Sequence, residues 1–160
     1  MKKSKTVQWL NQFDKYKDLT DEEYNNLKKI NLFNYRIKEI PEYFDFRNLE
    51  ILYLDNNQIT KIPNNFDCKN LKVLNLSNNK ITKIPDYFDF KNLKNLYLYK
   101  NKITEIPNNF DCKYLEELDL SYNKITKIPD NFYFKNLERL YLSYNQIKKI
   151  PKKYKDIIII

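Results

Sequence analysis

The sequence predicts an α/β solenoid, a fold in which short repeated units stack into one elongated domain. The first observation is that all six prolines lie 22 residues apart and that an isoleucine precedes each of them. A fixed period between about 20 and 50 residues is typical of chains whose units bury their apolar faces only against neighbouring units. The second observation is a leucine pattern that recurs with the same period. The prolines are Pro41, Pro63, Pro85, Pro107, Pro129 and Pro151.

The repeated unit predicts one short strand and one turn. The units follow the pattern LxxLxLxxNxIxxIPxxFxxxx, although the first has Tyr35 in place of the asparagine and the last has Tyr154 in place of the phenylalanine. In the third unit, Leu74 and Leu76 alternate with Val73 and Asn75, so one face of a strand points inward and the other outward. Stacked units therefore predict six parallel strands. The units begin at Leu27, Leu49, Leu71, Leu93, Leu115 and Leu137.

An asparagine follows each of the last five strands, at the point where the chain is expected to turn. A buried side-chain amide can bond backbone groups that a turn would leave unpaired, so we expect a structural ladder of amides, with a polar ligand site as the less favoured interpretation. After the turn, Ile81 and Ile84 are expected to point inward and Phe88 to close the far side. The asparagines are Asn57, Asn79, Asn101, Asn123 and Asn145.

These motifs resemble the leucine-rich repeat, whose core is LxxLxLxxN followed by an aliphatic residue. The resemblance covers residues 27 to 151. The unit length is similar to that of the phosphatase-regulator class, whereas the Ile-Pro step is similar to the general eukaryotic and bacterial repeats. The resemblance implies a right-handed superhelix, or horseshoe, with short parallel strands on the concave face and irregular or 3-10 segments on the convex face. It also implies protein contacts on the concave face.

The chain before the repeats, residues 1–26, predicts a helical cap. Thr20 and Glu23 have the spacing of a capping box, so a helix is expected to run from there to about Leu27. An earlier helix is expected over residues 5–17, where Trp9, Phe13 and Tyr16 would share one side. These aromatic residues are expected to cover the open end of the core. A partner-binding amphipathic helix is the alternative.

The chain after the repeats, residues 152–160, ends in four isoleucines. The favoured interpretation is a lid in which Ile157 to Ile160 pack over the last repeat. The alternative is self-association with a second chain through this apolar segment. We otherwise expect a monomer.

Cysteine usage and the termini bear on the compartment. Cys68 and Cys112 occupy the same place two repeats apart, which predicts a separation of about 10 Å, beyond the ~7 Å that a disulfide allows between Cα atoms. Two core thiols are typical of a reducing compartment. The sequence shows neither the apolar part of a signal peptide nor a transmembrane stretch. These features predict a cytoplasmic or intracellular protein, in the host cytoplasm if the chain is viral or an effector.

The composition disfavours an enzyme and predicts no cofactor and no metal site. The chain contains no histidine and no glycine, so it lacks Ser-His or Cys-His pairs and a phosphate-cradling glycine loop. Two cysteines without histidine are too few for a zinc site. Glu116 and Glu117 are expected on opposite faces of a strand, with no cleft to raise a pKa.

The net charge of +8 raises the alternative of a nucleic-acid or polyanion binder. Lys61, Lys83, Lys127 and Lys149 recur on one flank, and Glu105 interrupts them. Lysine, asparagine and isoleucine are also what an AT-rich genome supplies, and only three arginines are present. Nucleic acid is therefore the less favoured partner. A structural module without a dedicated partner is the third alternative.

The outward strand positions and the residues after them carry the favoured hypothesis, a non-enzymatic scaffold that binds a protein partner. Tyrosine interleaved with serine, asparagine and aspartate is typical of protein-recognition surfaces. The alternative is that these tyrosines serve only the fold, because tyrosine also suits half-exposed strands. The part from Tyr97 to Tyr144 is the expected hot spot. The candidate contact residues are Tyr53, Asn75, Asn95, Tyr97, Tyr99, Glu117, Asp119, Tyr122, Arg139, Tyr141 and Tyr144.

Overall fold

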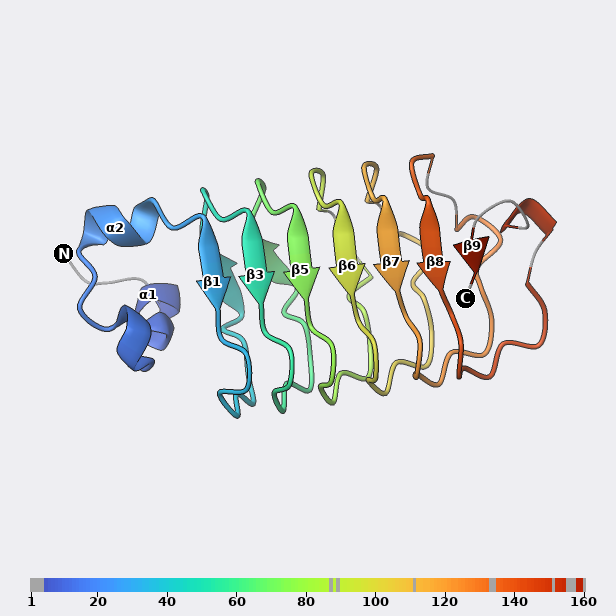
Figure 1. Ribbon diagram of the computed structural model, residues 1–160, viewed down its shortest axis with the longest axis horizontal. Helices are drawn as coiled ribbons and strands as arrows, with labels where there is room; N and C mark the ends of the chain where they lie inside the picture. Colours follow the sequence, from blue (N-terminus) through green and yellow to red (C-terminus); the bar gives the residue numbers. More distant parts are fainter. Residues whose placement is uncertain are drawn as a thin grey trace.

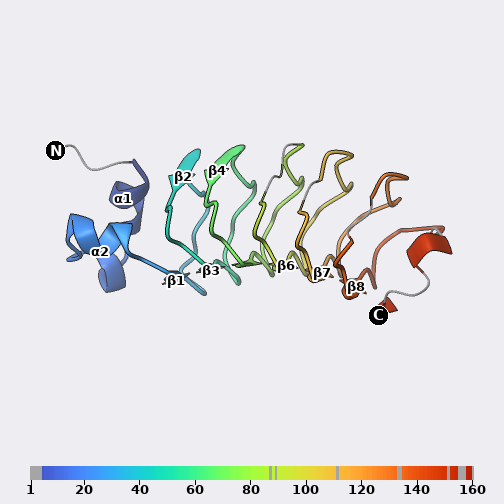
Figure 2. The ribbon, with the colours of Figure 1, turned by 90° about the horizontal axis from the view of Figure 1, so that it is seen from above.

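The chain folds into an elongated solenoid (Figure 1), as the sequence predicts. The computed structural model describes residues 5–86, 88, 90–110, 112–132, 135–150, 152–154 and 158–159. Its main sheet has seven parallel strands in the order β1-β3-β5-β6-β7-β8-β9. In Figure 2 the repeats fan out away from this sheet, so the sheet lies on the inner, concave side.

The first six strands of the main sheet occupy positions 3 to 5 of the six repeats, counted from the leucine that starts each repeat. Leu52 pairs with Leu74 and Tyr53 with Asn75, and the same register continues along the sheet. A given position of the repeat therefore forms a column in space. The strands are β1 (Lys29–Asn31), β3 (Ile51–Tyr53), β5 (Val73–Asn75), β6 (Asn95–Tyr97), β7 (Glu117–Asp119), β8 (Arg139–Tyr141) and β9 (Ile158–Ile159).

The core lies between the sheet and the loops behind it. Leu74, Leu76 and Ile81 have no exposed surface, and Ile84 and Phe88 are buried as predicted. Most of this apolar surface is shared between neighbouring repeats, because the contacts of a solenoid are made repeat to repeat. Each repeat thus depends on its neighbours for its shape.

The predicted ladder of turn asparagines is confirmed. The Asn101 side chain donates to the carbonyl oxygens of Leu76 (3.0 Å) and Leu98 (3.1 Å). Its oxygen accepts a hydrogen bond from the Ile81 N–H (2.9 Å). Asn57, Asn79 and Asn123 repeat this arrangement and are buried, so these amides hold the turns of adjacent repeats together. We call Asn57, Asn79, Asn101, Asn123 and Asn145 the turn-amide column.

The convex side carries more order than the expected irregular or 3-10 segments in its first two repeats. Here β2 (Tyr43–Asp45) and β4 (Asn65–Asp67) form a two-stranded parallel sheet behind the main sheet (Figure 2). The stacked rings of Phe44 and Phe66, with centroids 4.7 Å apart, lie between them. Ring stacking in register allows the backbones to pair.

The two cysteines are core residues, as predicted. Cys68 and Cys112 are buried, and their thiols donate to the carbonyl oxygens of Phe44 (4.0 Å) and Phe88 (3.9 Å). The Phe90 ring occupies the corresponding place in the repeat between them. It leans toward Phe66, with a centroid distance of 5.3 Å, so large and small residues interdigitate along the core.

The N-terminal segment contains α1 (Lys5–Leu10), a 3-10 turn η1 (Asp14–Tyr16) and α2 (Asp21–Asn25). The capping box of Thr20 and Glu23 is confirmed. The first helix is shorter than the predicted span 5–17 because Phe13 is extended (φ −104°, ψ 122°) and its ring packs on Tyr35 at 5.4 Å. Trp9 contacts Phe44 at 5.7 Å.

Tyr16 also contacts the free edge of the main sheet. Its hydroxyl oxygen accepts a hydrogen bond from the backbone N–H of Asn31 in β1 (2.8 Å). Leu10, Tyr16 and Tyr24 belong to the same buried cluster as the repeats. The aromatic residues of this segment are therefore packed on the first repeat.

At the other end, the 3-10 turn η2 (Lys152–Tyr154) precedes β9, which pairs with β8 in parallel. The register joins Arg139 with Ile158 and Leu140 with Ile159. Ile157 and Ile160, named in the lid hypothesis, lie outside the described residues. None of the helices in the described part of the chain has the length and apolarity needed to cross a bilayer.

Candidate protein-binding face

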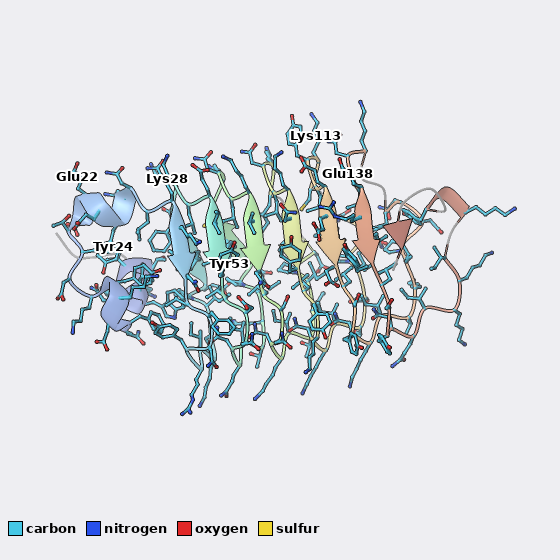
Figure 3. The ribbon with its side chains drawn as sticks, viewed as in Figure 1. Glu22, Tyr24, Lys28, Tyr53, Lys113 and Glu138 are labelled. Atoms are coloured by element: carbon cyan, nitrogen blue, oxygen red, sulfur yellow. The ribbon has the colours of Figure 1, made fainter. Side chains whose placement is uncertain are left out.

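The sheet face brings the predicted contact residues of the strands together. The side chains at position 5 of each repeat are half-buried and stand in register across adjacent strands. Figure 3 shows Tyr53, one of them, over the sheet. We call Asn31, Tyr53, Asn75, Tyr97, Asp119 and Tyr141 the central column.

A polar network connects four of the predicted residues on β6, β7 and β8. The Glu117 carboxylate accepts hydrogen bonds from Arg139 through Nη2 (2.7 Å) and Nε (3.1 Å) and from Asn95 through Nδ2 (3.3 Å). The hydrogen bond with Glu117 raises the pKa of Arg139. Burial, and then the Glu117 charge, raise the pKa of the Tyr97 hydroxyl. Only 14% of the Glu117 side chain is exposed, and its hydrogen bonds with Asn95 and Arg139 hold the carboxylate in place.

Asp119 supports the turn that follows β7. Its Oδ1 accepts a hydrogen bond from the backbone N–H of Ser121 (2.9 Å), and Asn75 makes the equivalent bond with Ser77 (3.0 Å). Burial raises the pKa of the Asp119 carboxyl, although the bonds with Ser121 oppose the shift. An amide or a carboxyl group at position 5 of the repeat can therefore make the same hydrogen bond with the turn.

Three predicted tyrosines gather at the edge of the sheet face where the strands end. The rings of Tyr99 and Tyr122 meet edge to face with centroids 5.2 Å apart, and those of Tyr122 and Tyr144 stack at 4.1 Å. The hydrogen bond with Tyr144 raises the pKa of Tyr122. Tyr144 is 71% exposed and Tyr122 is 42% exposed. We call these three residues the tyrosine ladder.

Position 8 of every repeat has a left-handed backbone conformation, which sequence reasoning missed. Asn34, Asn56 and Asn78 at this position were a signal that could have revealed it, because asparagine tolerates positive φ better than most residues. Tyr122 and Tyr144 adopt φ values of 56° and 55° there. We call Asn34, Asn56, Asn78, Lys100, Tyr122 and Tyr144 the left-handed column.

The edge where the strands begin carries a shallow groove of about 600 Å³ that the sequence did not reveal. Lys28 and Glu138, at this edge, are labelled in Figure 3. The groove is lined by residues that include Asn70, Asn92 and Tyr114. Its charges are paired: Glu50 binds Lys72 (2.7 Å) and Lys28 (3.7 Å), and Glu116 binds Lys94 (2.7 Å). These ion pairs connect neighbouring repeats, and the groove therefore carries little net charge.

The lysine flank of the nucleic-acid hypothesis is also partly neutralised. Lys61 pairs with Glu42 (3.4 Å), and Lys83 pairs with Asp86 (3.1 Å). These pairs are exposed, so they offset only part of the charge of the two lysines.

Within the described residues, no group of three or more cysteine, aspartate or glutamate side chains could hold a metal ion.

The solenoid and its register define a repeat protein with an exposed inner sheet, and comparison with known families gives its class. The model of Leucine Rich repeats (2 copies) matches residues 25–68, 47–90, 69–112, 91–133 and 115–155. These matches cover most of the chain. The protein therefore belongs to the leucine-rich repeat family, with about five to six repeats.

Solved structures agree with this fold. Listeria monocytogenes InlP is 29% identical, with a TM-score of 0.76 over 85% of this chain and 40% of that one. A chain of the LRIM1/APL1C complex is 25% identical, with a TM-score of 0.71 over 78% of this chain and 24% of that one.

The plant peptide hormone receptor RGFR1, solved in complex with RGF2, is 27% identical, with a TM-score of 0.53 over 62% of this chain and 21% of that one. This chain thus spans well under half the length of these proteins. No curated protein sequence matches the chain.

Proposed function

We propose that the protein is a non-enzymatic scaffold that binds a protein partner on its sheet face. The observation that carries this proposal is the central column, a line of half-buried tyrosine, asparagine and aspartate side chains in register across adjacent strands. Tyrosine offers a large contact area at a low entropic cost and keeps a polar tip. The network of Asn95, Glu117 and Arg139 beside it reduces the ordering that binding would require.

Two of the similar structures are complexes, LRIM1 with APL1C and RGFR1 with RGF2, which supports the proposal by analogy. The proposal includes residues 1–26 as an N-terminal cap and residues 152–160 as a C-terminal lid. It also includes a reducing, intracellular location, supported by the two buried thiols. A dedicated cofactor has no role in it.

The test replaces the tyrosines of the central column, Tyr53, Tyr97 and Tyr141, with alanine. The immobilised protein is used to capture partners from a lysate at about 50 mM and about 200 mM salt, because binding to nucleic acid falls steeply over this range whereas apolar protein contacts do not. We expect the triple variant to lose the protein captured by the wild type at both salt concentrations.

The matched control is Tyr43→Ala with Tyr114→Ala, which removes two exposed tyrosines outside the sheet face. Circular dichroism establishes that each variant is folded. Retention of the same partner by a folded triple variant would contradict the proposal. Capture that requires low salt and survives the tyrosine changes would favour the polyanion alternative.

A further inference from the structure

Tyrosine stands at two left-handed positions where the other repeats favour asparagine. The backbone N–H of Tyr122 donates to the Ser143 carbonyl (2.9 Å), as the N–H of Asn78 does to Tyr99 (2.8 Å). These backbone hydrogen bonds between repeats hold position 8 in the left-handed conformation, so Tyr122 cannot relax to a more favourable one. A strained residue that the surrounding structure holds in place is a reason to look for function.

Four lysines lie beside the tyrosine ladder without an acidic partner. Lys80, Lys102 and Lys124 occupy position 10 of consecutive repeats, and Lys100 precedes Tyr122 in the left-handed column. All four are exposed, and none forms an ion pair in the described part of the chain. We call these four residues the edge lysines.

The nearby carboxylates do not neutralise the edge lysines. Glu117 is bound by Arg139, and Asp119 is turned toward the Ser121 N–H. Glu105 is exposed and lies three residues beyond Lys102 along the loop. The edge of repeats 3 to 6 thus combines exposed aromatic surface with free positive charge.

We propose that the tyrosine ladder and the edge lysines form the docking site for an extended, acidic segment of a partner protein that carries aromatic residues. The inference rests on the proposed function and names the partner's chemistry. Neighbouring repeats are ~4.8 Å apart, and same-side residues of an extended chain are ~6.6 Å apart, a mismatch that flexible lysine side chains can absorb. Aromatic residues of the segment would pack on the exposed Tyr122 and Tyr144 rings.

The geometry favours a peptide over single-stranded nucleic acid. Nucleic-acid sites of this kind offer aromatic faces on which successive bases stack. Here Tyr122 and Tyr144 already stack on each other at 4.1 Å, so a base cannot enter between them.

The test measures the binding of a fluorescein-labelled peptide of glutamates with two phenylalanines by fluorescence anisotropy. About eight residues at ~3.3 Å each more than span the edge from repeat 3 to repeat 6. The comparison probes are the same peptide with glutamine for glutamate, the same peptide with alanine for phenylalanine, and an oligothymidine of similar length. We expect the acidic aromatic peptide to bind at least about tenfold more tightly than each of them.

The variants separate the two parts of the site. Tyr122→Asn with Tyr144→Asn restores the residue that position 8 favours and should weaken binding about 30-fold. Lys102→Gln with Lys124→Gln should weaken it about tenfold. The matched control, Lys72→Gln with Lys94→Gln, removes the same charge from the opposite edge and should change binding no more than about twofold.

Three outcomes would overturn the inference: equal binding of the glutamine peptide, preferential binding of oligothymidine, or unchanged binding by the folded Tyr122 and Tyr144 variant. If partner capture requires Tyr53, Tyr97 and Tyr141 but peptide binding ignores the tyrosine ladder, the inference fails and the proposed function stands. If neither set of tyrosines affects either readout, both fail.

Discussion

The turn-amide column and the left-handed column are neighbours in the sequence, yet they follow opposite rules. Asn101 is buried, and its side chain bonds to four backbone groups from two repeats. Lys100, one residue earlier, is exposed and makes no side-chain bond in the described residues. The first column stays asparagine in five repeats, whereas the second changes from asparagine to lysine and tyrosine. The same turn thus separates residues that hold the fold from residues that are free to contact a partner.

Replacing Asn101 with alanine should have the largest effect. The change removes the donors to the Leu76 and Leu98 carbonyls and the acceptor of the Ile81 N–H. Each unpaired buried group costs about 1–3 kcal/mol, so we expect the free energy of unfolding to fall by about 3–5 kcal/mol in urea denaturation. The control Asn78→Ala, in the left-handed column, should cost about 1 kcal/mol. If both variants lost the same unfolding free energy, the two columns would not differ in their contribution to stability.

Replacing Tyr122 and Tyr144 with asparagine should have a smaller effect of opposite sign. A left-handed conformation costs most residues about 1–2 kcal/mol, which asparagine partly avoids. The loss of the stacked rings costs about 0.5–1.5 kcal/mol. We therefore expect the double variant to gain about 1 kcal/mol of unfolding free energy, measured by urea denaturation.

The control Tyr99→Asn removes a ladder ring at position 7, which has no left-handed backbone, and should lower stability. A double variant that is less stable than the wild type by more than about 1 kcal/mol would show that the tyrosines serve the fold. In that case the left-handed column, like the turn-amide column, would contribute to stability.

The repeat period allowed the solenoid, the buried leucines and the turn amides to be predicted, because each of them follows from one pattern repeated in register. The sequence also placed Tyr97, Glu117 and Arg139 on one face. It did not reveal that Glu117 joins Asn95 and Arg139, since such side-chain contacts depend on rotamers that no period encodes. The paired convex strands were missed because they depend on bonds between repeats. The left-handed backbone of Tyr122 was missed although the asparagines at the same position of the first three repeats pointed to it.

The smallest expected effect concerns Asp119, whose hydrogen bond holds the start of the same turn. Burial raises the pKa of its carboxyl above the unfolded value of about 3.9. Between these two pKa values the folded protein binds more protons than the unfolded chain, so stability falls as the pH rises through this window and stays lower above it. Asp119→Asn keeps an acceptor for the Ser121 N–H, as Asn75 does for Ser77, and does not titrate.

We therefore expect Asp119→Asn to be more stable than the wild type at about pH 7, by less than about 1 kcal/mol because solvent screens this half-buried group, with the difference vanishing near about pH 3. Urea denaturation across this range measures the change, and Asn75→Asp provides the reciprocal variant. Lower stability of Asp119→Asn at neutral pH would mean that the carboxylate itself, through its charge, helps to hold the turn. Asp119 would then stabilise the fold as the turn amides do, and the structural residues would include a member of the central column.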